Sequence, residues 1–140
     1  QWLYGIGGNN FVKTMTKLGS SRDELNVVSD QHGSPTYAKD LTEIIYQAIT
    51  KQIPYGIYNA TNEGYTTWYD FTKEILGEQG IKCKVNPVTT EEYIKMMNVV
   101  QAKRPFNSQM SKEKLKEQGI NVPNWKDGLK RYLEEAKNEE

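Results

Sequence analysis

The segment DQHGSPTYAKDL at positions 30–41 constrains the fold more than any other part of the chain. Gly33 and Pro35 interrupt any regular element that precedes them, and Thr36 is placed to cap a helix. Apolar residues then recur at helical spacing, at Leu41, Ile44, Ile45 and Ala48. The pattern predicts a strand end, a turn and a helix over residues 36–51. The polar residues of the turn either face a ligand or belong to an ordinary strand–turn–helix joint.

The remaining pattern is that of an α/β fold in which helices are separated by a few short strands. Helix starts are indicated by capping residues at Asn9 or Asn10, Thr67, Thr89, Ser111 and Asn124. Strands are expected near residues 1–4, 25–28, 57–60 and 82–88. We expect residues 1–140 to form a single domain, because 140 residues are enough for one hydrophobic core.

The composition excludes several classes of function. Eighteen basic and eighteen acidic side chains cancel, so the chain lacks the electrostatic character of proteins that bind nucleic acid or anionic membranes. Its apolar runs are too short to cross a bilayer. With one cysteine (Cys83) and one histidine (His32), it can form neither an internal disulfide nor a usual tetrahedral zinc site. We expect a cytoplasmic protein, because a lone cysteine suits a reducing compartment.

Four strings resemble the substrate half of dTDP-4-dehydrorhamnose reductases, within the extended short-chain dehydrogenase/reductase superfamily. They are QWLYG with NNFV in 1–12, DQHGSPTYAKDL at 30–41, GIYN with WYDF in 56–71, and RPFNS at 104–108. They follow the family's order, and the resemblance runs from residue 1 to about Leu133. It implies the C-terminal substrate-binding portion of such an enzyme, whose strands add to a larger parallel sheet and to a small separate one.

The resemblance also implies a Rossmann half that this chain lacks. Family members carry a glycine-rich dinucleotide-binding turn and a later Tyr-x-x-x-Lys pair. The glycine-rich segment 5–8 has Asn10 at the position of the third glycine, and no βαβ unit is expected around it. Tyr69 and Lys73 have the spacing of the pair but fall where the family has a structural helix, so we interpret them as a chance match. No catalytic or cofactor-binding residue is therefore expected in this chain.

The implied reaction reduces the 4-keto group of dTDP-4-dehydro-L-rhamnose to give dTDP-L-rhamnose for polysaccharide biosynthesis. NADPH or NADH would donate the hydride from the other half, and this chain would hold the dTDP-sugar. A homo-oligomer is possible within this resemblance, and a metal requirement stays open. Two alternatives also stay open. One is a non-catalytic relative such as the regulatory β subunit of methionine adenosyltransferase, and the other is a different sugar-nucleotide reductase or epimerase.

Arg104 is the first candidate for binding the substrate. An arginine can direct two donors onto phosphate oxygens, and Pro105 stiffens the backbone beside it. In extended family members an Arg-Pro pair near the C-terminus often faces the nucleotide diphosphate, which favours this role. The alternative is a surface arginine paired with a carboxylate.

Five further residues are candidates for binding the substrate. Trp2 either covers a face of the sugar or fills the core. Asn9 and Asn10 offer side-chain amides in front of a helix start that suits a phosphate, although capping alone would also explain them. Asp30 and Gln31 either bond to the sugar or base, or hold the turn. By contrast, Trp68 and Trp125 are expected in the core, and the acidic pairs 91–92 and 134–135 on solvated helix faces.

Overall fold

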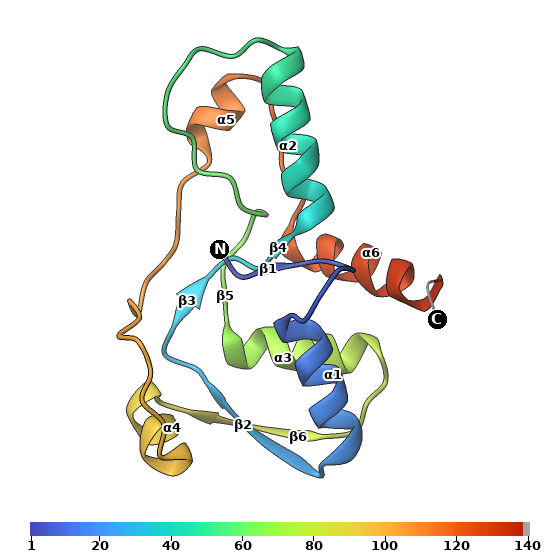
Figure 1. Cartoon of the computed structure of the whole chain (residues 1–140), viewed down its shortest axis with the longest axis vertical. Coiled ribbons are helices and arrows are strands. Elements are labelled where there is room, and N and C mark those ends of the chain that lie inside the picture. Colours follow the sequence, from blue (N-terminus) through green and yellow to red (C-terminus); the bar gives the residue numbers. More distant parts are fainter. Residues whose placement is uncertain (139–140) are drawn as a thin grey trace. The chain divides into compact units, whose positions relative to one another are not determined.

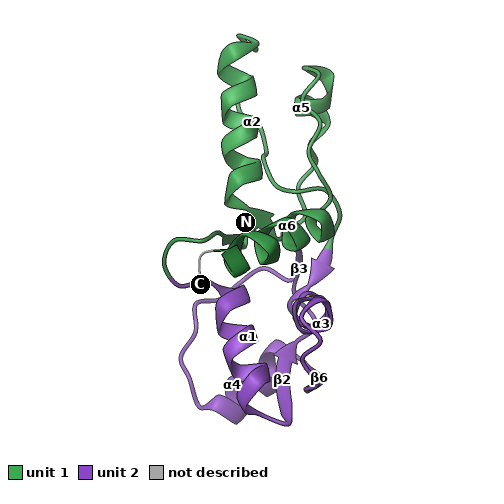
Figure 2. Cartoon of the chain, turned by 90° about the vertical axis from the view of Figure 1, so that its right-hand side faces the viewer, with its two compact units in different colours: residues 1–8, 34–65, 109–140 green, residues 9–33, 66–108 purple. Residues whose placement is uncertain are grey.

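The computed structural model describes residues 1–138, and the chain divides into two compact units (Figures 1 and 2). Unit 1 is assembled from residues 1–8, 34–65 and 109–140, and unit 2 from residues 9–33 and 66–108. The overall class is α/β with short strands, as predicted. Within residues 1–138, no helix combines the length and the apolar character needed to cross a membrane.

Unit 1 is built on a parallel pair of very short strands. These are β1 (Leu3–Tyr4) and β4 (Thr36–Tyr37), and Leu3 lies opposite Thr36. The chain passes from β4 directly into α2 (Ala38–Thr50), and later segments add α5 (Glu113–Glu117) and α6 (Trp125–Asn138). Two local predictions were wrong. Thr36 lies in β4 rather than capping α2, and residues 57–60 form no strand.

Tyrosine rings from three distant segments form the centre of unit 1. Tyr4 stacks on Tyr37 with 5.8 Å between ring centroids, and the edge of Tyr132 meets Tyr4 at 5.1 Å. All three residues are almost completely buried. They join β1, β4 and α6, and the burial of three large aromatic rings is a major source of stability for this unit.

A buried carboxylate, that of Asp40, also fixes α6 to α2. The Arg131 guanidinium donates to both of its oxygens, with Nη1 at 2.7 Å and Nη2 at 2.8 Å, and Asn62 Nδ2 donates at 2.6 Å. Bonding to this carboxylate raises the pKa of Arg131 above its ordinary value. Gly128 leaves room for the group, because a Cβ there would lie 3.1 Å from Asp40 Oδ2.

One expectation about the last helix was wrong. Glu135 was expected to be solvated, but its carboxylate pairs with Lys39 and accepts a hydrogen bond from the Tyr37 hydroxyl. Burial, with Glu135 beside it, raises the pKa of Tyr37, so that hydroxyl stays protonated and can donate. The pair therefore ties α6 to the start of α2.

Unit 2 contains a two-stranded parallel sheet and three helices. Strand β2 (Glu24–Val28) pairs with β6 (Lys84–Val88) in register along its whole length. Its helices are α1 (Phe11–Ser21), α3 (Trp68–Glu78) and α4 (Thr90–Met97). A separate antiparallel pair joins β3 (His32–Gly33) to β5 (Thr66–Thr67). This pair agrees with the small separate sheet that the resemblance implied.

The alternating sequences of β2 and β6 separate the two faces of their sheet. Leu25 and Val27 are buried with Leu76 of α3, and side chains of α1 pack against this cluster. On the polar side, Asn86 Nδ2 donates to Glu24 Oε2 at 3.0 Å and to Asn26 Oδ1 at 3.2 Å. One face is therefore covered by helices and the other is polar, as the period-two pattern predicts.

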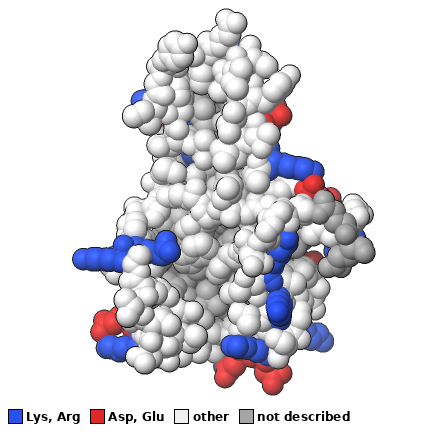
Figure 3. Space-filling model, viewed as in Figure 1, with Lys and Arg blue, Asp and Glu red and all other residues white. Residues whose placement is uncertain are grey.

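The helix starts of unit 2 confirm the predicted capping residues. Asn10 caps α1 by accepting from the Lys13 amide at 3.0 Å, and Thr67 caps α3. Thr89 forms a full capping box with Glu92 at the start of α4. On the molecular surface, basic and acidic side chains are interspersed on the face that Figure 3 shows, in keeping with a net charge of zero.

Candidate functional site

The carboxyl ends of β2 and β6 meet at one edge of their sheet, because the two strands are parallel. Val28 and Val88 are paired there, and the Ser29 amide donates to the Val88 carbonyl at 2.9 Å. From this edge the chain continues into the turn at residues 29–33 and into α4. Ligands of parallel α/β sheets commonly bind outside the carboxyl ends of the strands. The turn that the sequence singled out is therefore in a favourable place for a site.

Asp30 anchors the first residue of α4. Its carboxylate accepts from the Thr90 amide at 3.0 and 3.1 Å and from the Thr90 hydroxyl at 2.6 Å. A negative charge at a helix N-terminus is favourable, because the peptide dipoles leave partial positive charge there. The structure therefore shows Asp30 holding the turn, one of the two roles expected for it.

Gln31 connects two helix starts through its side-chain amide. It is 7% exposed, its Nε2 donates to Thr90 Oγ1 at 3.0 Å, and its Oε1 accepts from Trp68 Nε1 at 3.2 Å. The Trp68 ring in turn contacts Phe11, with 4.5 Å between centroids. Phe11, Trp68 and Thr90 are the first residues of α1, α3 and α4. Three helix N-termini therefore converge at the carboxyl end of the parallel pair.

Converging helix N-termini create a region of positive electrostatic potential even where no charged side chain contributes to it. Asp30 already bonds to the start of α4, so the start of α1 is better placed to receive an added anion. There the amides of Phe11 and Val12 precede the first bond of the helix, and Asn10 is the cap. Asn9 is exposed beside them. The residues that sequence reasoning missed are Trp68 and Thr90, and each directly follows a capping threonine, which is the signal that could have found them.

Arg104 lies in an exposed segment whose continuation is fixed beside the same turn. The His32 amide donates to the Phe106 carbonyl at 2.7 Å, and the Ser108 amide donates to the His32 carbonyl at 2.8 Å. Asn107 forms a parallel bridge with His32. Arg104 thus lies two residues before Phe106, where the chain becomes bonded to β3. Strand β3 itself directly follows Gln31 in the sequence. Among residues 1–138 it forms no ion pair, which disfavours the surface-pair alternative.

Trp2 does not belong to the unit that contains the converging helix starts. Trp2 belongs to unit 1, half-buried and with a φ of +44°, and its carbonyl accepts from the Thr36 amide at 3.2 Å. The five other candidates belong to unit 2.

Tyr69 packs against the core of unit 2, and Lys73 Nζ lies 5.1 Å from the centre of its ring, an arrangement that supports a structural role. Within the described residues, no cluster of His, Cys, Asp and Glu could hold a metal ion.

Comparisons with known proteins agree with the resemblance seen in the four strings. Residues 1–138 match the family model described as the RmlD substrate binding domain. The spore coat polysaccharide biosynthesis protein SpsK of Bacillus subtilis is 43% identical over 134 residues, which are 96% of this chain and 45% of that protein.

Two solved structures of dTDP-4-dehydrorhamnose reductases are also similar. The one from Clostridium acetobutylicum is 41% identical with a TM-score of 0.89, covering 98% of this chain and 47% of that one. The one from Bacillus anthracis, in complex with NADP, is 41% identical with a TM-score of 0.84, covering 96% and 45%. The chain therefore spans about half the length of the proteins it matches. Its sequence and fold agree in placing it, and the chain belongs to the RmlD substrate binding domain family.

Proposed function

We propose that this chain is the sugar-nucleotide-binding domain of an NAD(P)H-dependent dTDP-4-dehydrorhamnose reductase, which converts dTDP-4-dehydro-L-rhamnose to dTDP-L-rhamnose. The observation that carries the proposal is the convergence of three helix N-termini, linked through Gln31 and Trp68, beside the segment of Arg104, which has no ion-pair partner among residues 1–138. The names of the relatives support the reductase over a regulatory subunit or another sugar-nucleotide enzyme. Polysaccharide biosynthesis, in the name of the Bacillus subtilis relative, is consistent with a dTDP-rhamnose product.

The diphosphate of the dTDP-sugar is the part that these residues can recognise. First-turn amides of α1 and the side chains of Asn9 and Asn10 would donate to phosphate oxygens, and Arg104 would add a charge-assisted fork. Asp30 and Gln31 would act as positioning residues, because their side chains already bond to Thr90 and Trp68. They fix the helix starts before the ligand arrives.

The nicotinamide cofactor supplies the hydride in this chemistry, but the residues of this chain do not fit it. A dinucleotide site needs a glycine-rich turn inside one βαβ unit. Here the glycine segment 5–8 follows β1 of unit 1, whereas the next helix, α1, packs in unit 2 against the cluster of Leu25, Val27 and Leu76. We therefore assign the cofactor and the proton donor to the part of the parent protein outside this chain.

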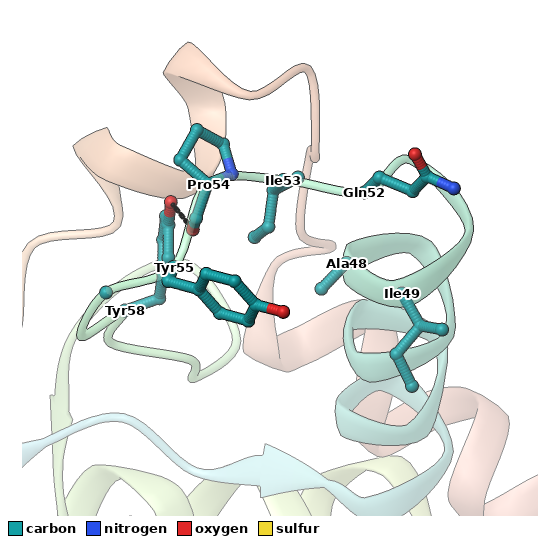
Figure 4. A pocket seen from close by; sticks show the side chains of 8 residues that line it. Ala48, Ile49, Gln52, Ile53, Pro54, Tyr55 and Tyr58 are labelled. Atoms are coloured by element: carbon teal, nitrogen blue, oxygen red, sulfur yellow. Dashed lines mark hydrogen bonds between the residues drawn. The ribbon is translucent and has the colours of Figure 1, made fainter.

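Unit 1 offers a surface on which that Rossmann half can pack. Parallel strands are normally buried in larger sheets with helices on both faces, yet β1 and β4 form a pair of their own and Leu3 is 56% exposed. The outer face of α2 exposes Ile45, Tyr46 and Ile49. It continues into an open pocket that Ala48 and Ile49 of α2 help to line, with Tyr55 directed toward Ala48 (Figure 4). The relatives contain a further stretch about as long as this chain, which could cover this surface.

Calorimetric titration with dTDP tests the binding role directly. The wild-type chain is expected to bind, and Arg104→Ala should weaken the affinity about ten- to a hundredfold, because a hydrogen bond to a charged group contributes about 1.5–3 kcal/mol. Arg22→Ala is the matched control, since Arg22 is an exposed arginine that follows α1 at its far end. Absence of dTDP binding, or an equal loss in both variants, would refute the proposal.

The chain alone is expected to lack reductase activity, because groups that act as a unit lose nearly all of their effect when some are removed. The measurement is nicotinamide oxidation with dTDP-4-dehydro-L-rhamnose as substrate. Turnover above a heat-inactivated control would show that the cofactor and proton-donor chemistry does reside in this chain.

A further inference from the structure

Residues 99–105, here called the strap, are unusual in making no hydrogen bond or ion pair with the rest of residues 1–138. All seven are exposed, and none forms a hydrogen bond, an ion pair or a ring contact with any part of residues 1–138. The strap begins after Asn98, where α4 ends in the left-handed conformation with a φ of +49°. It ends at Phe106, whose carbonyl is bonded to His32.

The downstream end of the strap lies at the candidate site, and its upstream end is connected to the site through α4. Its upstream helix, α4, is held at its first residue by Asp30 and Gln31, and its downstream end is held along β3. A segment without bonds of its own opens and closes at little free-energy cost, so even a few ligand contacts can shift its position. Seven residues can reach about 23 Å when extended. The strap is therefore free to move between the end of α4 and Phe106, which is bonded beside the site.

The composition of the strap matches the two chemical parts of a nucleoside diphosphate. Val100 is fully exposed and Val99 is 37% exposed, although neither gains anything from contact with water. Lys103 and Arg104 are two adjacent cations in a chain of zero net charge. Apolar side chains suit the face of a base or a deoxyribose, and the two cations suit a diphosphate.

We propose that the strap closes over the bound nucleotide, with Val99 and Val100 covering its base or sugar and Lys103 joining Arg104 at the diphosphate. This inference rests on the proposed function of the same site and extends it to Val99, Val100 and Lys103, which that proposal does not use. It makes closure a consequence of binding, because the strap has no bonds to other residues of the described range 1–138 that would hold it closed before then.

The rate of limited trypsin digestion reports whether the strap is open or closed. Trypsin can cut after Lys103, whereas the bond between Arg104 and Pro105 resists it because proline follows. The bond after Lys82 is the internal reference, since Lys82 is exposed and lies before β6, at the opposite end of the sheet. Saturating dTDP should slow cleavage after Lys103 at least tenfold and leave cleavage after Lys82 unchanged.

A double variant separates closure from simple shielding by a nearby ligand. Val99→Ser with Val100→Ser should be cut as fast as the wild type without dTDP, and should lose most of the protection when dTDP is saturating. The matched control is Ile57→Ser, at an exposed apolar position of unit 1, which should keep full protection. Full protection in the double variant would overturn the covering role of the valines and with it the proposal.

The two proposals fail in different ways. If calorimetry shows that dTDP binds while cleavage after Lys103 is unchanged, the strap does not close, and the binding function stands. If dTDP does not bind at all, both the function and the closure are refuted.

Discussion

Replacing Arg131 with methionine should destabilise unit 1 strongly, because it leaves the Asp40 carboxylate buried with one partner instead of two. Asp40 is 6% exposed, and the guanidinium supplies two of its three hydrogen bonds from other side chains. Methionine keeps most of the apolar stem of the arginine, so the variant removes mainly charge and donors. The Asn62 amide would remain as a neutral donor at 2.6 Å.

The expected loss follows from the burial of the two partners. Removing one partner of a buried ion pair costs about 3–5 kcal/mol. The Arg131 side chain is 37% exposed, so solvent already screens part of its charge, and its second pair, with Asp127, is on the surface and contributes little. We therefore expect the free energy of unfolding to fall by about 2–3 kcal/mol, or about 30- to 150-fold in the folding equilibrium.

Urea unfolding followed by tryptophan fluorescence measures this loss, since Trp125 is buried in α6 of the same unit. The midpoint should fall by about 1 M urea. Lys137→Met, an exposed change on the same helix, should leave it nearly unchanged. Adding Asp40→Asn to Arg131→Met should recover at least half of the loss. A double variant no more stable than Arg131→Met would refute the reasoning, because the cost would then not come from the stranded carboxylate.

Three further outcomes are expected. Hydrogen bonds from Lys39 and Tyr37 lower the pKa of Glu135 from 4.5, so its contact stabilises unit 1 fully above pH 4.5 and is lost as the pH falls through the lowered value. Urea midpoints of Glu135→Gln should therefore fall less with acidification than those of the wild type. Gly64→Ala should lower the Tm by about 5 °C or more, because Gly64 has a φ of +84° and a Cβ there would lie 2.8 Å from Asn124 Nδ2. Gly7→Ala, with nothing within 4 Å of the added Cβ, should change the Tm little. Light scattering should show self-association of the chain through β1, and Trp2→Lys with Leu3→Lys should abolish it; monomers in both would show that the chain itself covers this strand.

The parts of the fold that the sequence predicts well are those fixed within a few residues. Thr67 and Thr89 were predicted as helix caps, and both are, because a cap depends on a side chain and an amide three positions apart. Thr36 resembles such a cap in sequence, but its conformation depends on a residue far away in the chain. Pairing with Leu3 draws it into β4, and α2 begins at Ala38 without a side-chain cap.

The candidate site shows the same division between local and distant information. The strand end at Asp30 and Gln31 was predicted from the local turn, and its position at the sheet edge agrees. The partners of these residues, Thr90 and Trp68, lie 60 and 37 positions away. The capping threonines before them mark two helix starts, but no local pattern indicates that these starts bond to the turn. Glu135 was missed for a similar reason, since its partners Lys39 and Tyr37 precede it by most of the chain. A single sequence therefore locates the turn but leaves its bonding open.

The three-ring centre of unit 1 has a consequence for how the protein is made. Tyr4 is made well before Tyr132, so the ring cluster cannot close until residue 132 has left the ribosome. Residues 9–108 contain every segment of unit 2 and are finished earlier. During translation, unit 2 is therefore expected to fold first, while apolar side chains of unit 1 stay exposed until its last helix has been made. Variants that slow the docking of α6 would prolong the exposure of these apolar side chains. Chaperone dependence in the cell would then rise before the measured stability of the finished protein changed.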